Sequence, residues 1–181
     1  MAEYIAFLRG INVGGSKPIK MDALRNEFES LGFERVRTVL TSGNVLFESK
    51  GTDRHAVTRQ IKDKLEKTFG HDTSVILRTR REVFDLVDSN PFEHVKITPK
   101  TRLYVTFFME KPRSQLKIPY KSPEQRFKIL RVSPGEVYST ITLSLHAGTT
   151  ELMKFIDKEF SRENTTRNWN TVIKIYDKMT A

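Results

Sequence analysis

The fold is decided by residues 35–48, RVRTVLTSGNVLFE, which form a predicted β-hairpin. Val, Thr, Leu and Phe dominate the two runs Arg35–Leu40 and Val45–Glu48, and these residue types favour strands. Residues 41–44, TSGN, separate the runs and supply the Ser, Gly and Asn that tight turns use. We therefore expect two antiparallel strands joined by a short turn.

The segments on either side complete a βαββαβ unit. Glu3–Arg9 and Thr73–Arg78 are predicted strands. Between them and the hairpin, apolar residues at helical spacing predict two helices, each followed by a glycine suited to a left-handed C-cap. Their positions are Met21, Leu24, Phe28 and Leu31 before Gly32, and Val57, Ile61, Leu65 and Phe69 before Gly70. This order is ferredoxin-like, an α+β fold in which both helices cover one face of an antiparallel sheet.

The second half is also predicted to be α+β. Residues 79–82, TRRE, have the spacing of a capping box and predict a helix that runs toward Asn90 and ends before Pro91. The remaining predicted elements are strands at Thr101–Met109, Phe127–Val132 and Val137–Leu145, a helix marked by Leu152, Phe155, Ile156 and Phe160, and a last helix marked by Trp169, Val172, Ile173 and Tyr176, with Thr165 or Thr166 as N-cap. We expect a ferredoxin-like domain over residues 1–79 and a second α+β subdomain over residues 80–181. The second half is either a degenerate duplication of the first or an addition to it, and the two halves show no residue-level repeat.

The composition is that of a soluble globular protein. Hydrophobic residues make up 38% of the 181 residues and charged residues 29%, no apolar run approaches the about 20 residues that cross a bilayer, and no basic secretory start is present. Cysteine is absent, so disulfides and thiolate chemistry are excluded and a cytoplasmic location is expected. The net charge of +9 attracts anions, but the Lys and Arg are dispersed, which favours a role in solubility over nucleic-acid binding.

A glycine-rich connection, residues 9–17 (RGINVGGSK), joins the first strand to the first helix. Such a loop can direct backbone N–H groups at an anion, and its candidate binding residues are Arg9, Asn12, Gly14 and Gly15. The segment matches neither the dinucleotide fingerprint nor the P-loop, and Pro18 interrupts the route into the helix. The alternative is a connection that needs its glycines only for positive φ angles.

Two further polar segments are candidates for the same ligand. Residues 165–171, TTRNWNT, open the predicted last helix, where the fork of Arg167 and the amides of Asn168 and Asn170 could bind a phosphate or carboxylate. Ser42 and Asn44 lie at the predicted hairpin tip, where ordinary turn chemistry is the alternative. We expect the glycine-rich loop and the start of the last helix to be neighbours. The alternative for residues 165–171 is ordinary helix capping by Thr and Asn. If Arg167 is a ligand donor, its guanidinium should be partly exposed in a concave surface; if it ties the last helix to the sheet, it should be buried against carbonyls or a carboxylate.

Several kinds of chemistry find no support in the sequence. The four histidines show no metal-ligand spacing, and no paired acids announce acid–base catalysis. No metal and no cofactor are therefore predicted, and no catalytic residue can be named. An RNA-recognition motif is disfavoured because residues 42–47, SGNVLF, have its glycine but lack the preceding basic residue and the paired aromatics.

Five segments of the chain carry a family resemblance, namely residues 9–15 (RGINVGG), 42–45 (SGNV), 90–92 (NPF), 134–135 (PG) and 166–172 (TRNWNTV). In these segments the chain resembles an uncharacterised, mainly bacterial family, the domain of unknown function 1697. The resemblance implies an α+β fold of ferredoxin-like character and brings no activity and no catalytic residues.

The residues favour a binder of a small anionic ligand, a nucleotide or phosphorylated metabolite, with no membrane association. The alternatives are an enzyme acting on such a ligand, followed by a nucleic-acid-binding module. The oligomeric state is left open by the sequence.

Overall fold

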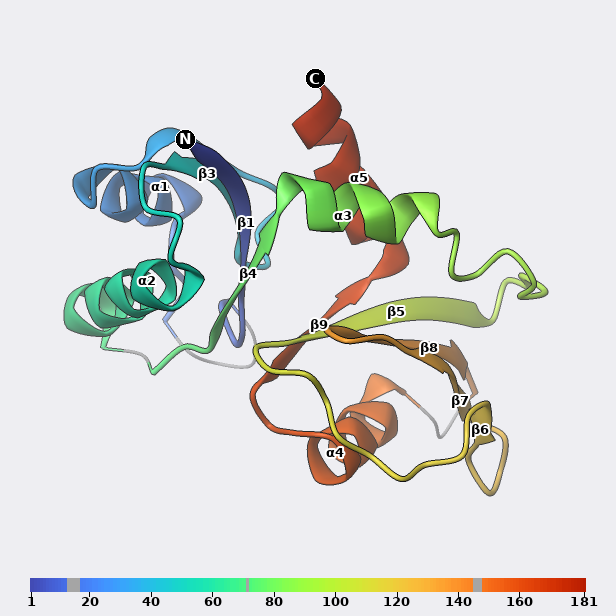
Figure 1. Cartoon of the computed structure of the whole chain (residues 1–181). Coiled ribbons are helices and arrows are strands. Elements are labelled where there is room, and N and C mark those ends of the chain that lie inside the picture. The colour runs from blue at the N-terminus through green and yellow to red at the C-terminus, as the bar shows by residue number, and fades with distance from the viewer. Residues whose placement is uncertain (13–16, 71, 145–147) are drawn as a thin grey trace. The chain divides into compact units, whose positions relative to one another are not determined.

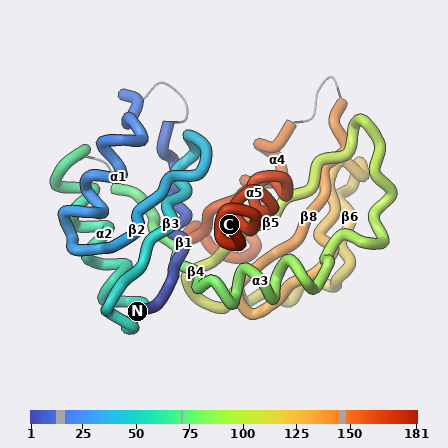
Figure 2. Tube along the Cα trace, turned by 90° about the horizontal axis from the view of Figure 1, so that it is seen from above, coloured from blue at the N-terminus to red at the C-terminus, as the bar shows by residue number. Residues whose placement is uncertain are grey.

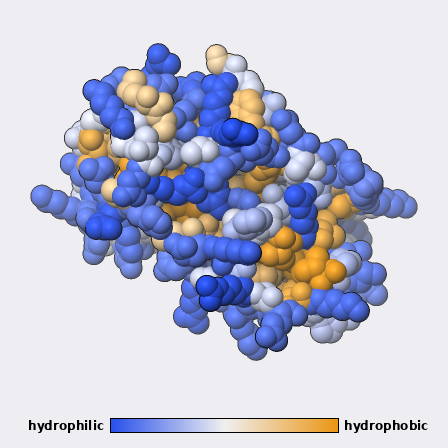
Figure 3. Space-filling model, in the orientation of Figure 1, coloured by the Kyte–Doolittle hydropathy of each residue, from blue (hydrophilic) through white to orange (hydrophobic). Residues whose placement is uncertain are grey.

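The computed structural model describes residues 1–12, 17–70, 72–144 and 148–181. The chain divides into two compact units, of which unit 1 comprises Met1–Asp85 and Lys174–Ala181, and unit 2 comprises Leu86–Ile173. Across these described residues the chain forms five helices and two antiparallel sheets, so the α+β prediction is confirmed (Figure 1). Hydrophilic side chains cover most of the face shown in Figure 3.

The sheet of unit 1 has the strand order β2-β3-β1-β4, with every neighbouring pair antiparallel. Its strands are β1 (Ala2–Leu8), β2 (Glu34–Thr38), β3 (Asn44–Ser49) and β4 (Val75–Thr79). The helices α1 (Met21–Ser30) and α2 (Arg54–Phe69) lie together beside β1–β3 in both views (Figures 1 and 2). This is the arrangement predicted for residues 1–79, with both helices on one face of the sheet.

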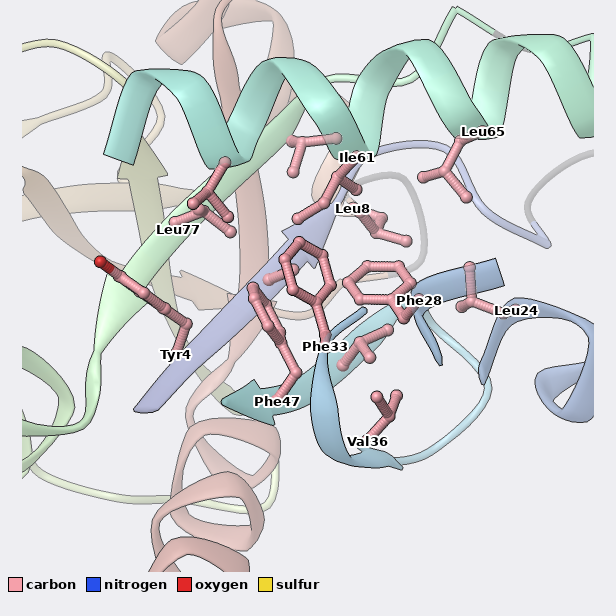
Figure 4. Close-up of a cluster of buried hydrophobic side chains, with 14 of the residues drawn as sticks. Tyr4, Leu8, Leu24, Phe28, Phe33, Val36, Phe47, Ile61, Leu65 and Leu77 are labelled. Atoms are coloured by element: carbon pink, nitrogen blue, oxygen red, sulfur yellow. The ribbon is translucent and has the colours of Figure 1, made fainter. Parts of the chain in front are cut away.

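The core of unit 1 forms between these helices and the sheet. Leu24 and Phe28 of α1 and Ile61 and Leu65 of α2 point toward the strands (Figure 4). The ring of Phe47, on β3, lies 5.4 Å from that of Phe28, and burial of such side chains is worth about 1.5–3 kcal/mol each. The helical stripes read from the sequence are therefore the buried faces.

The sheet of unit 2 has the order β6-β7-β8-β5-β9 and is also antiparallel throughout. Its strands are β5 (Thr101–Phe108), β6 (Tyr120–Lys121), β7 (Phe127–Val132), β8 (Glu136–Thr142) and β9 (Asn164–Asn168). The helix α4 (Thr149–Glu159) buries Leu152 and Ile156 in the core of this unit. The helices α3 (Arg80–Asp88) and α5 (Trp169–Thr180) each follow the last strand of a sheet and each contribute residues to both units.

The two sheets share one topology. Leaving out the short β6, the order β7-β8-β5-β9 repeats the order β2-β3-β1-β4 of unit 1. Each hairpin accepts a hydrogen bond at the same place, from Leu8 N to Gly43 O at 2.8 Å and from Phe108 N to Gly135 O at 2.9 Å. Both hairpins also contain a register shift, before Arg37 in β2 and before Arg131 in β7.

The strand registers give a residue correspondence between the two halves of the chain that their sequences alone do not show. Residues 4–7 (YIAF) correspond to residues 104–107 (YVTF), and residues 42–45 (SGNV) correspond to residues 134–137 (PGEV). The first helix, α1, has no helical counterpart, because a loop and β6 connect β5 to β7. The topology favours the duplication among the two alternatives, and the division of the chain at residue 79 stays a proposal beside the contact-based units.

The predicted start of the last helix is wrong. Thr165, Thr166 and Arg167 belong to strand β9, and α5 begins at Trp169 (Figure 1). The physical reason is pairing with β5, where the Thr106 and Thr166 hydroxyls hydrogen bond at 2.8 Å. The buried face of α5 is also shifted from the prediction, and of the predicted stripe only Val172 is fully buried, beside Ile175 and Met179.

One buried hydroxyl in unit 2 is a stability liability. Ser139, on β8, is fully buried, and within the described part of the chain its Oγ has no hydrogen-bond partner. Ser139→Ala is expected to raise the free energy of unfolding by about 0.5–1 kcal/mol, because it removes an unsatisfied polar group. Urea denaturation measures the change.

The matched control is Ser49→Ala in unit 1. Ser49 is also buried, but its Oγ accepts a hydrogen bond from Gly51 N at 3.0 Å. This variant should lose about 1 kcal/mol. Equal losses in the two variants would contradict the assignment of Ser139 as unsatisfied.

Candidate functional site

The side chain of Asn12, in the glycine-rich connection, hydrogen bonds to the protein's own backbone. Its Nδ2 donates to Ile19 O at 3.0 Å and to Thr41 O at 3.1 Å, and its Oδ1 accepts from Ile19 N at 2.6 Å. Both amide protons and the carbonyl oxygen are therefore engaged. These contacts favour the structural interpretation of Asn12, while Gly14 and Gly15 lie outside the described residues.

The hairpin-tip candidates and Arg9 are also engaged within unit 1. Asn44 is fully buried and donates through Nδ2 to Val39 O at 2.9 Å and to Ser42 Oγ at 3.0 Å. Arg9 is half-buried, and its backbone N–H donates to Ser74 O at 3.0 Å. For Ser42 and Asn44, turn formation is the role that these bonds support.

The guanidinium of Arg167 is buried, as expected for a structural role and not for a ligand donor. Arg167 is only 8% exposed, and its Nη1 donates to Thr165 Oγ1 at 2.7 Å and to Thr166 O at 3.0 Å. Burial lowers the pKa of Arg167 to about 10, so the guanidinium stays charged near neutral pH. Because alternate residues of a strand face opposite sides of the sheet, Arg167 and Asn168 point in different directions.

Asn168 and Asn170 do line a pocket, at the junction of β9 and α5 in unit 2. The pocket has a volume of about 380 Å³. Asn168 caps the helix, since its Oδ1 accepts from Asn170 N at 2.9 Å. The full lining consists of Ile97, Thr101, Arg102, Leu103, Asn168, Trp169 and Asn170.

Arg102 supplies the positive charge of this pocket. Its Nη1 donates to Pro99 O and to Thr101 O, both at 2.9 Å, which orients the guanidinium at the start of β5. These carbonyls engage Nη1 alone. The other two guanidinium nitrogens, Nε and Nη2, make no hydrogen bond with the described residues. The site can therefore offer directed donors to an oxyanion.

Aromatic groups complete the surroundings of the pocket. The ring of Trp169 is half-buried and meets that of Phe92 edge-on, with centroids 5.1 Å apart. Next to the pocket, burial raises the pKa of Tyr104, although the charge of Arg102 and a hydrogen bond with Asn168 lower it. The phenol therefore stays protonated at neutral pH and keeps its O–H as a donor.

The structure brings together only part of the predicted site. Of the nine predicted residues, Asn168 and Asn170 line the pocket. Arg102 and Trp169 were missed as site residues, because no local signal distinguishes Arg102 and Trp169 was interpreted as part of the apolar stripe of the last helix. The glycine-rich segment belongs to unit 1 and the Arg167–Asn170 segment to unit 2, so their forming one site stays a prediction.

The described residues include no membrane-spanning helix and no metal-binding cluster. None of their helices has both the length and the apolar character required to cross a bilayer. No group of three or more His, Cys, Asp or Glu side chains gathers among them in a way that could hold a metal ion.

Comparison with known proteins identifies relatives without an assigned activity. A family model described as "Protein of unknown function (DUF1697)" matches residues 1–138. A comparison with curated proteins finds no match. A solved structure, described as that of conserved bacterial protein SP0830 from Streptococcus pneumoniae, superposes with a TM-score of 0.69 at 20% identity and covers 98% of each chain. At that identity, the likeness concerns the fold.

Proposed function

The chain belongs to the DUF1697 family of proteins of unknown function, and from that starting point we propose that it binds a small anionic ligand, a nucleotide or phosphorylated metabolite, in the pocket of unit 2. The observation that carries the proposal is the convergence of a guanidinium, two amides and an indole on one concavity of about 380 Å³. Small-ligand pockets commonly begin at about 300 Å³ and combine an apolar lining with a few polar groups.

The charge of the pocket supports an anion. Arg102 is the charged member of the lining, which contains no Asp or Glu. The first turn of α5 adds the positive end of its helix dipole, since Asn168 immediately precedes Trp169. The net charge of +9 favours approach of an anion over that of a cation.

The apolar part of the lining supports a ligand with a base or another flat ring. Leu103 and Trp169 are half-buried, and Ile97 is 61% exposed beside them. An indole offers a face on which a nucleobase can stack, an interaction worth about 1–3 kcal/mol. A nucleoside monophosphate combines that ring with a phosphate for Arg102.

The test is calorimetric titration of the protein with adenosine 5′-monophosphate, with inorganic phosphate and adenosine as its two parts. Arg102→Ala is expected to weaken binding of the monophosphate at least tenfold, because the variant loses the charge-assisted hydrogen bonds. Its melting temperature should change little, since the side chain is only half-buried and both of its hydrogen bonds go to carbonyls within three residues of it in the chain. Arg113→Ala, an exposed arginine in the loop before β6, is the matched control and should bind normally.

The outcomes separate the functional classes. Absence of binding of all three probes at millimolar concentration would overturn the proposal. Turnover of the monophosphate would assign an enzyme. Binding only to oligonucleotides, with a steep dependence on salt, would favour a nucleic-acid-binding module in its place.

A further inference from the structure

The two units contain pockets at the same place in their shared topology. Unit 1 has a pocket of about 510 Å³ lined by Ala2, Glu3, Thr79, Arg80, Arg81 and Phe84. Like the pocket of unit 2, it lies where the first strand of the sheet begins and where the last strand passes into a helix. The two pockets are therefore repeats of one structural position.

The strand registers give the residue correspondence. Tyr4 of β1 pairs with Thr79, the residue before α3, and Tyr104 of β5 pairs with Asn168, the residue before α5. Counting from these pairs, Glu3 corresponds to Leu103. By the same count, Glu82 in the first turn of α3 corresponds to Thr171 in the first turn of α5.

In unit 1 a carboxylate of the protein already occupies the pocket. Glu3 is only 20% exposed, and its Oε2 lies 3.0 Å from Arg80 Nη1. Its Oε1 lies 3.9 Å from Arg37 Nη2. An anion entering this pocket would therefore meet Arg80 already paired with Glu3, and Arg81 paired with Asp85 at 3.7 Å.

A second carboxylate closes the N-terminus of α3. Glu82 accepts from Thr79 N at 2.7 Å and takes two hydrogen bonds from Arg54 Nη2, each at 2.8 Å. Burial alone would raise the pKa of Glu82, but these hydrogen bonds and the charges of nearby arginines outweigh it, so the pKa is lowered. The carboxylate is therefore ionised at neutral pH. Unit 1 thus supplies two anionic groups of its own.

Neither carboxylate has a counterpart in unit 2, where Leu103 and Thr171 stand in their places. We infer that Leu103, which lines the unit 2 pocket, and Thr171, in the first turn of the helix that begins at that pocket, are specificity-determining residues. They leave the site open to an external oxyanion, whereas unit 1 holds Glu3 in its pocket and Glu82 in the first turn of α3. This inference rests on the proposed function and deepens it. It assigns one anionic ligand to each chain, bound through the oxyanion that both phosphates and carboxylates carry.

The test restores the missing carboxylates one at a time. Leu103→Glu is expected to weaken adenosine 5′-monophosphate binding at least tenfold, because its carboxylate at the pocket lining repels the phosphate. In Leu103→Gln the new side chain has the same size as glutamate but no charge. This variant should bind the monophosphate within about twofold of the wild type.

A second pair of variants keeps the test valid if position 103 tolerates no polar group. Thr171→Glu places a carboxylate where α3 has Glu82, and an acid in the first turn favours the helix. It should weaken binding of the monophosphate and of inorganic phosphate several-fold, whereas Thr171→Gln should not. Urea denaturation of each variant verifies that the fold is retained.

The outcomes distinguish this inference from the proposed function. Normal binding by folded Leu103→Glu and Thr171→Glu would overturn the inference and leave the anion-binding function standing. Equal weakening by the Glu and Gln variants would also overturn it, because the charge would then be irrelevant. Absence of binding by the wild-type chain would overturn both.

Discussion

Gly43→Ala is expected to lower the free energy of unfolding by about 2–5 kcal/mol. Gly43 has a φ of +79°, in the left-handed region, where an L-residue is disfavoured by about 1–2 kcal/mol. An added Cβ would also lie 3.0 Å from Leu8 Cβ and 3.1 Å from Ile11 Cβ, both in the buried core. Forcing a methyl group into a packed core costs about 1–3 kcal/mol more.

The rigidity of the surroundings explains why this position cannot relax. Gly43 O accepts from Leu8 N at 2.8 Å, so the turn is held directly against β1. The buried Asn44 side chain fixes the other side of the turn through Val39 O. A shift that relieved the contact with Leu8 would therefore break hydrogen bonds of the central hairpin.

Gly32→Ala is the matched control for backbone strain. Gly32 has a φ of +82°, and nothing lies within 4 Å of the position of its Cβ. This variant should lose only the conformational part, about 1–2 kcal/mol. Urea denaturation followed by circular dichroism measures both variants, and equal losses would refute the packing part of the prediction.

The fold of residues 1–79 could be predicted because local signals and burial agree there. Val57, Ile61 and Leu65 repeat at helical spacing and are the residues that α2 buries. Asp53 and Gly70 mark the ends of the same helix, the first by accepting from His55 N and Ala56 N, the second by its left-handed φ of 70°. Where each level indicates the same structure, periodicity suffices.

Strand β9 could not be predicted, because the strand that it pairs with, β5, is remote in sequence. Thr165 and Thr166 are suited to a helix N-cap and to a strand alike. Their pairing with Phe107 and Thr106 of β5 decides the outcome, and no feature of residues 164–168 announces that partner. Tertiary pairing here overrides a local capping signal.

The candidate pocket was predictable in part for the same reason. Asn168 and Asn170 were found because two amides lie close to the predicted start of a helix. The last helix does begin between them, at Trp169. Arg102 and Leu103 enter the pocket only through the pairing of β5 with β9. The missing counterparts of Glu3 and Glu82 become visible only when the two strand registers are compared.

Arg167→Lys is expected to lower the free energy of unfolding by about 1–3 kcal/mol while leaving ligand binding unchanged. The buried guanidinium donates from Nη1 to both Thr165 Oγ1 and Thr166 O, and a lysine replaces this planar group with a compact ammonium that does not occupy the position of Nη1. Buried acceptors left without a donor cost that amount, and an ammonium group is harder to desolvate than a guanidinium.

Two measurements separate this structural role from a ligand role. Urea denaturation should show the loss of stability in Arg167→Lys and none in Arg113→Lys, whose arginine is exposed. Calorimetry below the unfolding transition should give the same affinity for adenosine 5′-monophosphate in both variants, because Arg167 does not line the pocket. Wild-type stability with weakened binding in Arg167→Lys would reverse the assignment and return Arg167 to the ligand. The strand position of Arg167, next to but facing away from Asn168, is the physical reason to expect that stability and binding separate at this pair of neighbours.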